Sequence, residues 1–240
     1  MQQKNREMEN KYILLLETAT DSCSVALANN NTIIAEKYIN QPKAHASLLA
    51  RYICDILEEN NITMADCSAV AVSKGPGSYT GLRVGVSCAK GLCYGAGKPL
   101  VSVCTLATIT QMAIDNKLYS GNGDYLVVPM IDARRMEVYT ANFNSNGEQL
   151  TPVEAKILNE NSYAEELAAG PVLFTGNGAE KFRPLVKGNP NAFFAEQMPH
   201  ACGMRIIASN KVEAGDFEDN AYFEPFYLKD FVAGKPKKLL

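Results

Sequence analysis

The segment ETATDS, from Glu17 to Ser22, concentrates the side chains that could take part in phosphate chemistry. Carboxylates such as Glu17 and Asp21 can hold Mg²⁺, and hydroxyls and backbone amides at a tight turn can meet phosphate oxygens. Apolar runs on both sides predict that the segment joins two strands. We take Thr18, Thr20 and Asp21 as candidate phosphate-binding residues of a vestigial loop.

Metal chemistry finds little support in the sequence. A metal-binding helix can present two histidines four residues apart, but the position four residues after His45 is Leu49. No carboxylate lies within four residues of His45, and the other histidine, His200, is far away in the sequence. We therefore predict no metal site and no catalytic residue, and we interpret His45 as a residue at the entry to a helix.

The segment Gly75-Pro76-Gly77-Ser78 has two interpretations. It could be an anion-binding turn at a helix N-terminus, although the only nearby basic residue, Lys74, comes before it. It could instead be a rigid turn in which glycine and proline set the backbone and Ser78 or Thr80 caps the helix. We favour the rigid turn.

The helix expected over residues 80–94 is built mainly from small residues. Glycine costs a helix about 1 kcal/mol relative to alanine, so Gly81, Gly85 and Gly91 need a compensating reason. Close approach of another helix is one reason, and packing against the helix's own sheet is the alternative. The helix expected over residues 47–59, with one apolar stripe, is its predicted neighbour.

The elements that must position these residues occur in a recognisable order. Apolar runs predict strands at residues 12–17, 23–28, 32–38, 69–73 and 100–103, with helices at 47–59, 80–94 and 105–115. This order is typical of an RNase H-like module. The order then restarts with strands at 124–132 and 136–143, a helix at 161–168, a strand at 172–175 and a short helix at 179–186.

We therefore predict an α/β protein with two RNase H-like lobes, the second degenerate, over the alternative of a single mixed domain. Residues 1–11 are expected to be a disordered N-terminus and residues 12–115 the first lobe. Residues 116–221 are expected to form the second lobe, ending in a short helix at 205–208. Residues 222–240 are expected to be a tail that packs back on the lobes.

Composition narrows the class of function. The 240 residues are 47% hydrophobic and 20% charged with a net charge of -3, which argues against autonomous binding to DNA or RNA. Seven cysteines without CxxC spacing indicate reduced thiols, and no apolar run suggests a signal peptide or a membrane span. We expect a cytoplasmic protein without membrane or DNA partners.

Five segments of the chain resemble one known family. They are LLLETATDSCSVAL, KAHASLL, VSKGPGSYTGLRVGVSCAKGL, IDARRMEVY and FEPFYLKDF, and the resemblance covers nearly the whole chain from Ile13 to Asp230. The family they resemble is TsaB (YeaZ), a paralogue of the catalytic subunit TsaD within the actin-like, sugar kinase and Hsp70 ATPase superfamily.

The resemblance implies an accessory subunit that is not an enzyme by itself. With TsaD and the ATPase TsaE it would serve transfer of threonylcarbamoyl to N6 of adenosine 37 in tRNAs that read ANN codons. It implies a homodimer when alone, indirect contact with tRNA, no intrinsic cofactor, and ATP or ADP contact only within the complex. The implied partner interface is His45, Leu48, Leu49, Tyr52, Ile56, Thr80, Gly81, Val84, Gly85 and Cys88.

An autonomous ATP-dependent kinase or ATPase, or a peptidase, remains the alternative. A kinase needs a second phosphate loop, but Asp132-Ala133-Arg134-Arg135 is bulky and lacks glycine. The turn Gly176-Asn177-Gly178 resembles the glycine pair that contacts adenosine in working members of the superfamily, although such a turn is as often only a turn. A peptidase needs an activated nucleophile, and no histidine forms a recognisable pair with a serine or cysteine.

Overall fold

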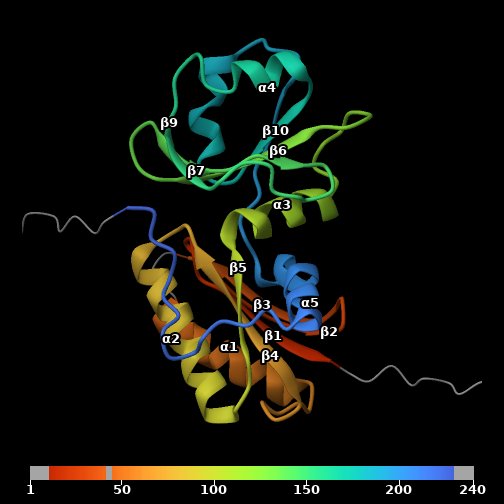
Figure 1. Ribbon diagram of the computed structural model, residues 1–240, viewed down its shortest axis with the longest axis vertical. Coiled ribbons are helices and arrows are strands. Elements are labelled where there is room, and N and C mark those ends of the chain that lie inside the picture. The colour runs from red at the N-terminus through yellow and green to blue at the C-terminus, as the bar shows by residue number, and fades with distance from the viewer. Residues whose placement is uncertain (1–10, 42–44, 230–240) are drawn as a thin grey trace, which may run out of the picture.

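The computed structural model describes residues 11–41 and 45–229 and arranges them in two lobes, each built around one β-sheet (Figure 1). Of the predicted disordered N-terminus, residues 1–11, the structure describes Lys11. Of the predicted tail, residues 222–240, it describes residues 222–229. No helix within the two described ranges has both the length and the apolar character needed to cross a membrane.

The first lobe contains a five-stranded sheet in the order β3-β2-β1-β4-β5. Strands β1, β4 and β5 are parallel, and β2 and β3 extend the sheet as an antiparallel meander. Their bounds are β1 Tyr12–Glu17, β2 Ser22–Asn29, β3 Thr32–Asn40, β4 Cys67–Gly75 and β5 Leu100–Cys104.

Both faces of this sheet are buried, which explains why β1 is apolar at nearly every position. Side chains alternate along a strand, so Leu14 and Leu16 face one side and Ile13 and Leu15 the other. The helices α1 (His45–Glu59) and α2 (Tyr79–Ala96) cover the first side. The short 3-10 helix η3 (Ala201–Met204) and the helix α5 (Arg205–Ala214) cover the second.

The second lobe contains a sheet in the order β11-β10-β6-β7-β9, with β8 paired to β6. Helix α3 (Thr105–Asp115) packs on one face, and α4 (Ala164–Ala169) and two 3-10 helices pack on the other. The remaining bounds are β6 Leu126–Asp132, β7 Glu137–Thr140, β8 Phe143–Asn144, β9 Glu154–Ile157, β10 Val172–Thr175, β11 Ala192–Ala195, η1 Ala179–Lys181 and η2 Arg183–Val186.

The predicted fold class is confirmed: two α/β lobes, each with a central sheet, and a smaller, less regular second copy. The predicted lobe boundaries are wrong at two places. Helix α3, assigned to the first lobe, packs its buried apolar side on the second sheet. The segment 201–214, assigned to the second lobe, returns to the first sheet. In Figure 1 the blue helix α5 accordingly lies beside the red and orange strands.

Several predicted elements also differ in extent. The short helix expected over residues 179–186 is the pair of 3-10 helices η1 and η2, because Pro184 cannot donate a helical hydrogen bond. The helix expected over residues 205–208 continues to Ala214, where Gly215 in a left-handed conformation ends it. Strands β9 and β11 are short and half-buried, and the sequence pattern did not predict them.

The chain that follows α5 runs back along the first lobe. The Glu218 amide donates to the Leu100 carbonyl at 2.9 Å, and the Phe226 amide donates to the Lys74 carbonyl at 2.7 Å. Between these points, the Lys90 ammonium on α2 donates to the carbonyls of Ala221 and Phe223 at 3.1 and 2.9 Å. We call residues 216–229 the tail; it lies across α2 (Figure 1).

Candidate functional site

The turn between β1 and β2 lies against the first turn of α2. The Thr18 hydroxyl donates to the Gly81 carbonyl at 2.8 Å, and the Ala19 carbonyl accepts the Ser78 amide at 2.6 Å. A Cβ atom on Gly77 would lie 2.2 Å from the Ala19 carbonyl oxygen, so only glycine allows this approach. The candidate phosphate loop is therefore held closed by the chain's own helix.

Much of the hydrogen-bonding capacity of this turn is already used within the lobe. The amides of Thr18 and Ala19 donate to the Ser73 hydroxyl at 3.4 Å and to Glu17 Oε1 at 2.6 Å. Thr18 is fully buried and faces α2 rather than the cleft, and its role in binding phosphate stays a prediction. Thr20 and the exposed Asp21 do line the cleft between the lobes, and their role in binding phosphate stays a prediction.

Glu17 is a buried carboxyl group at the end of β1. Its side chain is fully enclosed, and Oε2 has no hydrogen-bond partner among the described residues. Burial raises the pKa of Glu17 to about 7, although hydrogen bonds from the Ala19 amide and Ser73 oppose the shift. A carboxylate of this kind cannot reach solvent to hold a metal ion beside a nucleotide.

A cleft of about 710 Å³ separates the two lobes at this point. Its walls come from the β1–β2 turn, the start of α2, the turn between β6 and β7, and the tail. The residues that line it are Ala19, Thr20, Asp21, Pro76, Gly77, Ser78, Tyr79, Thr80, Ile131, Asp132, Ala133, Arg134, Tyr139, Asn177, Phe226, Tyr227, Leu228 and Lys229.

The turn between β6 and β7 in the second lobe also has its polar groups hydrogen-bonded within that lobe. Asp132 Oδ1 accepts from the Lys181 ammonium and from the Arg134 amide, both at 2.6 Å. The Asp132 amide donates to the Asn177 side chain at 2.9 Å. A Cβ atom on Gly176 would lie 2.4 Å from the Met130 carbonyl oxygen. The glycine pair thus serves close packing of this turn on β6.

The segment Gly75-Pro76-Gly77-Ser78 is a turn that starts α2. The Ser78 hydroxyl accepts the Gly81 amide at 3.3 Å, which caps the helix, as one of the two interpretations predicted. Because the Ser78 amide is bonded to Ala19, it is not free to bind an anion. The helix ends at Ala96, and Gly97 caps it in the left-handed conformation.

Five of the ten residues in the implied partner interface are buried within the first lobe. Leu49 and Ile56, for example, lie on the inner side of α1 and are only 2% and 1% exposed. Side chains in such positions pack inside the lobe, so their burial does not support a place in a partner interface, which stays a prediction. The five are His45, Leu49, Ile56, Gly81 and Gly85.

The glycines of α2 divide into two kinds. A Cβ atom on Gly81 or Gly85 would lie 2.1 Å from the Thr18 carbonyl oxygen or 2.2 Å from Thr18 Oγ1. These glycines therefore admit the β1–β2 turn, and a second subunit is not needed to explain them. Gly91 is exposed, and a Cβ atom there would meet nothing within 4 Å.

The other half of the implied interface is accessible on the outer sides of α1 and α2. Thr80 is exposed and the rest are half-buried: Leu48, Tyr52, Val84 and Cys88. His45, at the start of α1, instead lies with Nε2 3.1 Å from the Ser22 carbonyl oxygen. Its expected place at the entry to a helix agrees with the structure, in which α1 begins at His45, two residues earlier than expected.

Comparison with known proteins places this geometry in a family. The family model for TsaD, tRNA N6-adenosine threonylcarbamoyltransferase, matches residues 32–233. A protein of Escherichia coli K12 named tRNA threonylcarbamoyladenosine biosynthesis protein TsaB is 32% identical over 93% of this chain and 96% of its own length. The protein of that name from Bacillus subtilis is 31% identical over 73% of this chain and 75% of its own.

The chain belongs to the TsaB family. Its fold agrees with that of a solved family member, YeaZ from Pseudomonas aeruginosa, with a TM-score of 0.77 and 27% identity. The similarity covers 91% of this chain and all of that one. The resemblance seen in the sequence motifs is thereby confirmed.

Sequence reasoning missed two features of this TsaB-family site. One is the Lys181 ammonium, which lies 49 residues from Asp132 in the sequence and carries no motif. The other is the fit of α2 to the β1–β2 turn. The spacing of Gly81 and Gly85 signalled a close approach, but did not reveal that the neighbour is Thr18, over 60 residues earlier.

Proposed function

We propose that the chain is an accessory subunit in the biosynthesis of threonylcarbamoyladenosine in tRNA, acting as a non-catalytic partner of TsaD. Family membership supports the process, because the E. coli and B. subtilis relatives are named for it. The matching family model, which describes the threonylcarbamoyltransferase TsaD, supports the choice of partner.

The proposal that the chain is not catalytic is supported mainly by the closed β1–β2 turn. Phosphoryl and acyl transfer need donors aimed at the reacting group from an open site. Here the amides of Thr18 and Ala19 and the hydroxyl of Thr18 donate to the chain's own atoms, and Asp132 is paired with Lys181. An autonomous kinase would have to break these contacts before nucleotide could bind.

We propose the accessible half of α1 and α2 as the surface that binds TsaD. The half-buried side chains of Tyr52, Val84 and Cys88 lie on the apolar core of the lobe and present partly apolar surface beside it. Gly91 adds a place where a partner backbone could approach closely. In the absence of TsaD the same surface would pair two copies of the chain, while TsaE and tRNA would join through the complex.

Reconstitution tests the role in modification. Purified TsaD, TsaE, tRNA lacking the modification and threonylcarbamoyl-adenylate are combined with and without the chain, and modified adenosine is quantified by mass spectrometry. We expect modification to depend on the chain. Equal modification without it would refute the partner role, and ATP hydrolysis by the chain alone at rates typical of enzymes would favour the autonomous alternative.

A charge on the outer side of α2 tests the surface. Gly91→Glu should fold, because a Cβ atom there meets nothing, yet it should abolish co-purification with TsaD. Ala168→Glu is the matched control, since it places the same charge at an exposed position of α4. Retained TsaD binding by a folded Gly91→Glu chain would show that another surface makes the contact.

A further inference from the structure

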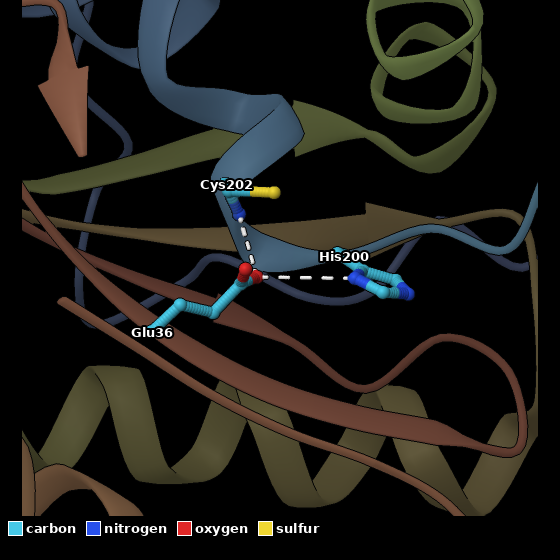
Figure 2. Close-up of side chains that lie close together, drawn as sticks. All are labelled: Glu36, His200 and Cys202. Carbon is cyan, nitrogen blue, oxygen red and sulfur yellow. Dashed lines mark hydrogen bonds and ion pairs between the residues drawn. The ribbon is translucent and has the colours of Figure 1, made fainter. Parts of the chain in front are cut away.

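Three side chains able to bind a metal ion meet on the side of the first sheet that η3 covers. Glu36 belongs to the edge strand β3, His200 comes directly before η3, and Cys202 lies within it. One ligand atom from each lies within 4.8 Å of the other two. Figure 2 shows the carboxylate pointing toward both the imidazole and the start of η3. In the described part of the chain, this is one such group of three.

Strand alternation places Glu36 on this side of the sheet. Glu36 pairs with Ala26 and Tyr38 pairs with Ser24 on β2, and both β2 residues face η3. Lys37, between them, points to α1 and forms an ion pair with Glu59 at 2.7 Å. The carboxylate is therefore directed at η3 by the pleat of the strand.

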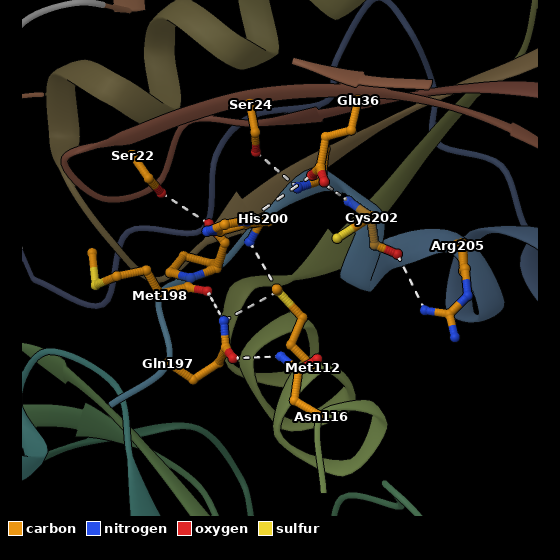
Figure 3. Close-up of polar contacts among 12 residues, drawn as sticks. Ser22, Ser24, Glu36, Met112, Asn116, Gln197, Met198, His200, Cys202 and Arg205 are labelled. Atoms are coloured by element: carbon orange, nitrogen blue, oxygen red, sulfur yellow. Dashed lines mark hydrogen bonds and ion pairs between the residues drawn. The ribbon is translucent and has the colours of Figure 1, made fainter. Parts of the chain in front are cut away.

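The segment that carries His200 and Cys202 is fixed by hydrogen bonds to its neighbours (Figure 3). The Ser22 hydroxyl donates to the Pro199 carbonyl and the Ala201 amide donates to the Ser24 hydroxyl, both at 2.8 Å. The His200 ring also stacks on Tyr38, with ring centroids 3.8 Å apart. The backbone and the imidazole are thus held in place independently of any ion.

The charges around the cluster suit a cation. Glu36 Oε1 lies 4.0 Å from His200 Nδ1 and accepts the Cys202 amide at 3.3 Å. The nearest guanidinium, on Arg205, is paired with Asp115 at 2.6 Å, so its positive charge is compensated. Metal binding would release the proton of the Cys202 thiol to solvent.

We propose that Glu36, His200 and Cys202 form a binding site for a divalent transition-metal ion of the Zn²⁺ type. Carboxylate oxygen, imidazole nitrogen and thiolate are the three ligand types that Zn²⁺ takes in proteins. Tetrahedral ligation needs donors about 3.5 Å apart, so small side-chain rotations have to close gaps of up to about 1 Å between the three ligand atoms. Three protein ligands leave a fourth position for water or an external ligand.

The ion would join β3 at the edge of the first sheet to η3, segments more than 160 residues apart in the sequence. Its binding does not depend on the proposed role in tRNA modification. Such a clamp would stabilise the docking of residues 199–208 on the lobe, since a ligand that binds only the folded state stabilises it.

Cobalt spectroscopy tests the site. The full-length chain, untagged, reduced and freed of metal, is titrated with Co²⁺ and then with Zn²⁺. We expect visible bands of tetrahedral cobalt and a thiolate charge-transfer band that saturate at one ion per chain and vanish when Zn²⁺ replaces Co²⁺. Zn²⁺ should also raise the melting temperature.

Two variants test proposed ligands, and a third serves as the control. Cys202→Ser should remove the charge-transfer band, whereas Cys54→Ser, at an exposed position of α1, should keep it. Glu36→Gln should weaken Zn²⁺ binding at least about tenfold, and it retains an oxygen that can accept the Cys202 amide, so its fold should be preserved. The proposal is overturned if the wild-type chain gives no thiolate band, if Cys202→Ser keeps the band, or if a folded Glu36→Gln chain binds Zn²⁺ as tightly as wild type.

Discussion

At the scale of single residues, the first lobe holds a carboxyl group where a carboxylate would be expected to face solvent. Glu17 ends the apolar run of β1, and the sequence placed it among the carboxylates that could hold Mg²⁺. The fold encloses it between β1, Ser73 and the Ala19 amide. No local pattern reveals such burial, because it depends on β4 and α2, which come more than 50 residues later.

The buried Glu17 should make stability depend on pH. Because the folded-state pKa is raised to about 7 from 4.5, the folded protein keeps a proton that the unfolded chain loses over this interval. The contribution of Glu17 to the free energy of unfolding is fully present below about pH 4.5. It is lost as the pH rises through 7, by about 3 kcal/mol in total. Urea unfolding of wild type and Glu17→Gln from pH 5 to 8 measures it. The free energy of unfolding of Glu17→Gln should not show this decline. If wild type and Glu17→Gln gave parallel curves of unfolding free energy against pH, the raised pKa of Glu17 would be contradicted.

The two kinds of glycine in α2 should respond oppositely to alanine. Gly85→Ala brings a methyl group against Thr18 Oγ1 and should cost about 1–3 kcal/mol. Gly91→Ala meets open space and should stabilise by about 0.5–1 kcal/mol, because alanine is the better helix former. Thermal unfolding measures both effects, because each kcal/mol should shift the melting temperature of a chain of this size by about 2–4 °C. A destabilised Gly91→Ala would mean that α2 packs differently.

At the scale of elements, strands and long helices of the first lobe could be predicted from alternation and helical spacing. β1, β4 and α2 were expected within a few residues of their observed bounds. The second lobe was harder to predict because its elements are short. β9 and β11 have four residues each, too few for a clear period, and their pairing with β7 and β10 supplies the hydrogen bonds that define them.

The tail lies across α2, and Lys90 makes two of the hydrogen bonds that hold it there. Lys90→Met removes the donors to the Ala221 and Phe223 carbonyls but keeps an apolar side chain of similar length. We expect faster proteolysis and hydrogen exchange within residues 219–226, with the melting temperature lowered by only a few degrees.

Lys98→Met is the control for this experiment. Lys98 also donates to a backbone carbonyl, but that carbonyl belongs to Ala65, outside the tail. It should leave exchange within residues 219–226 unchanged. If Lys90→Met also leaves it unchanged, then other contacts of the tail, such as the bonds of the Glu218 and Phe226 amides, are sufficient to hold it.

At the scale of the whole molecule, α3 connects the lobes. Leu106, Ile109 and Ala113 pack on the second sheet, while Thr108 and Met112 approach Gly203 in η3, which covers the first. Sequence reasoning assigned the helix to one lobe because it directly follows β5. The return of residues 201–214 could not be foreseen, because its small contact residues Ala201 and Ala208 carry no signal of a distant partner.

The contact between α3 and η3 should therefore control how firmly the lobes are held together. In Gly203→Ala the new methyl group would lie 2.5 Å from Met112 Cγ and 2.9 Å from the Thr108 carbonyl oxygen. We expect a loss of about 1–3 kcal/mol and faster hydrogen exchange in both α3 and residues 201–208.

Gly170→Ala provides the matched control, because its backbone is extended and a Cβ atom there meets nothing. It should leave stability and exchange near wild type. Faster exchange confined to η3 in Gly203→Ala would show that the two lobes are held together elsewhere.

The return of the chain to the first sheet has a consequence for synthesis on the ribosome. One face of β1, β4 and β5 is covered only when Ala201, Met204 and Ala208 arrive, long after those strands have been made. The second sheet, from β6 to β11, is contiguous in the chain and can pair as soon as it emerges. A nascent chain of this protein thus carries an uncovered apolar sheet for most of its translation, and chaperones that bind such surfaces should associate with it until about residue 208 leaves the exit tunnel.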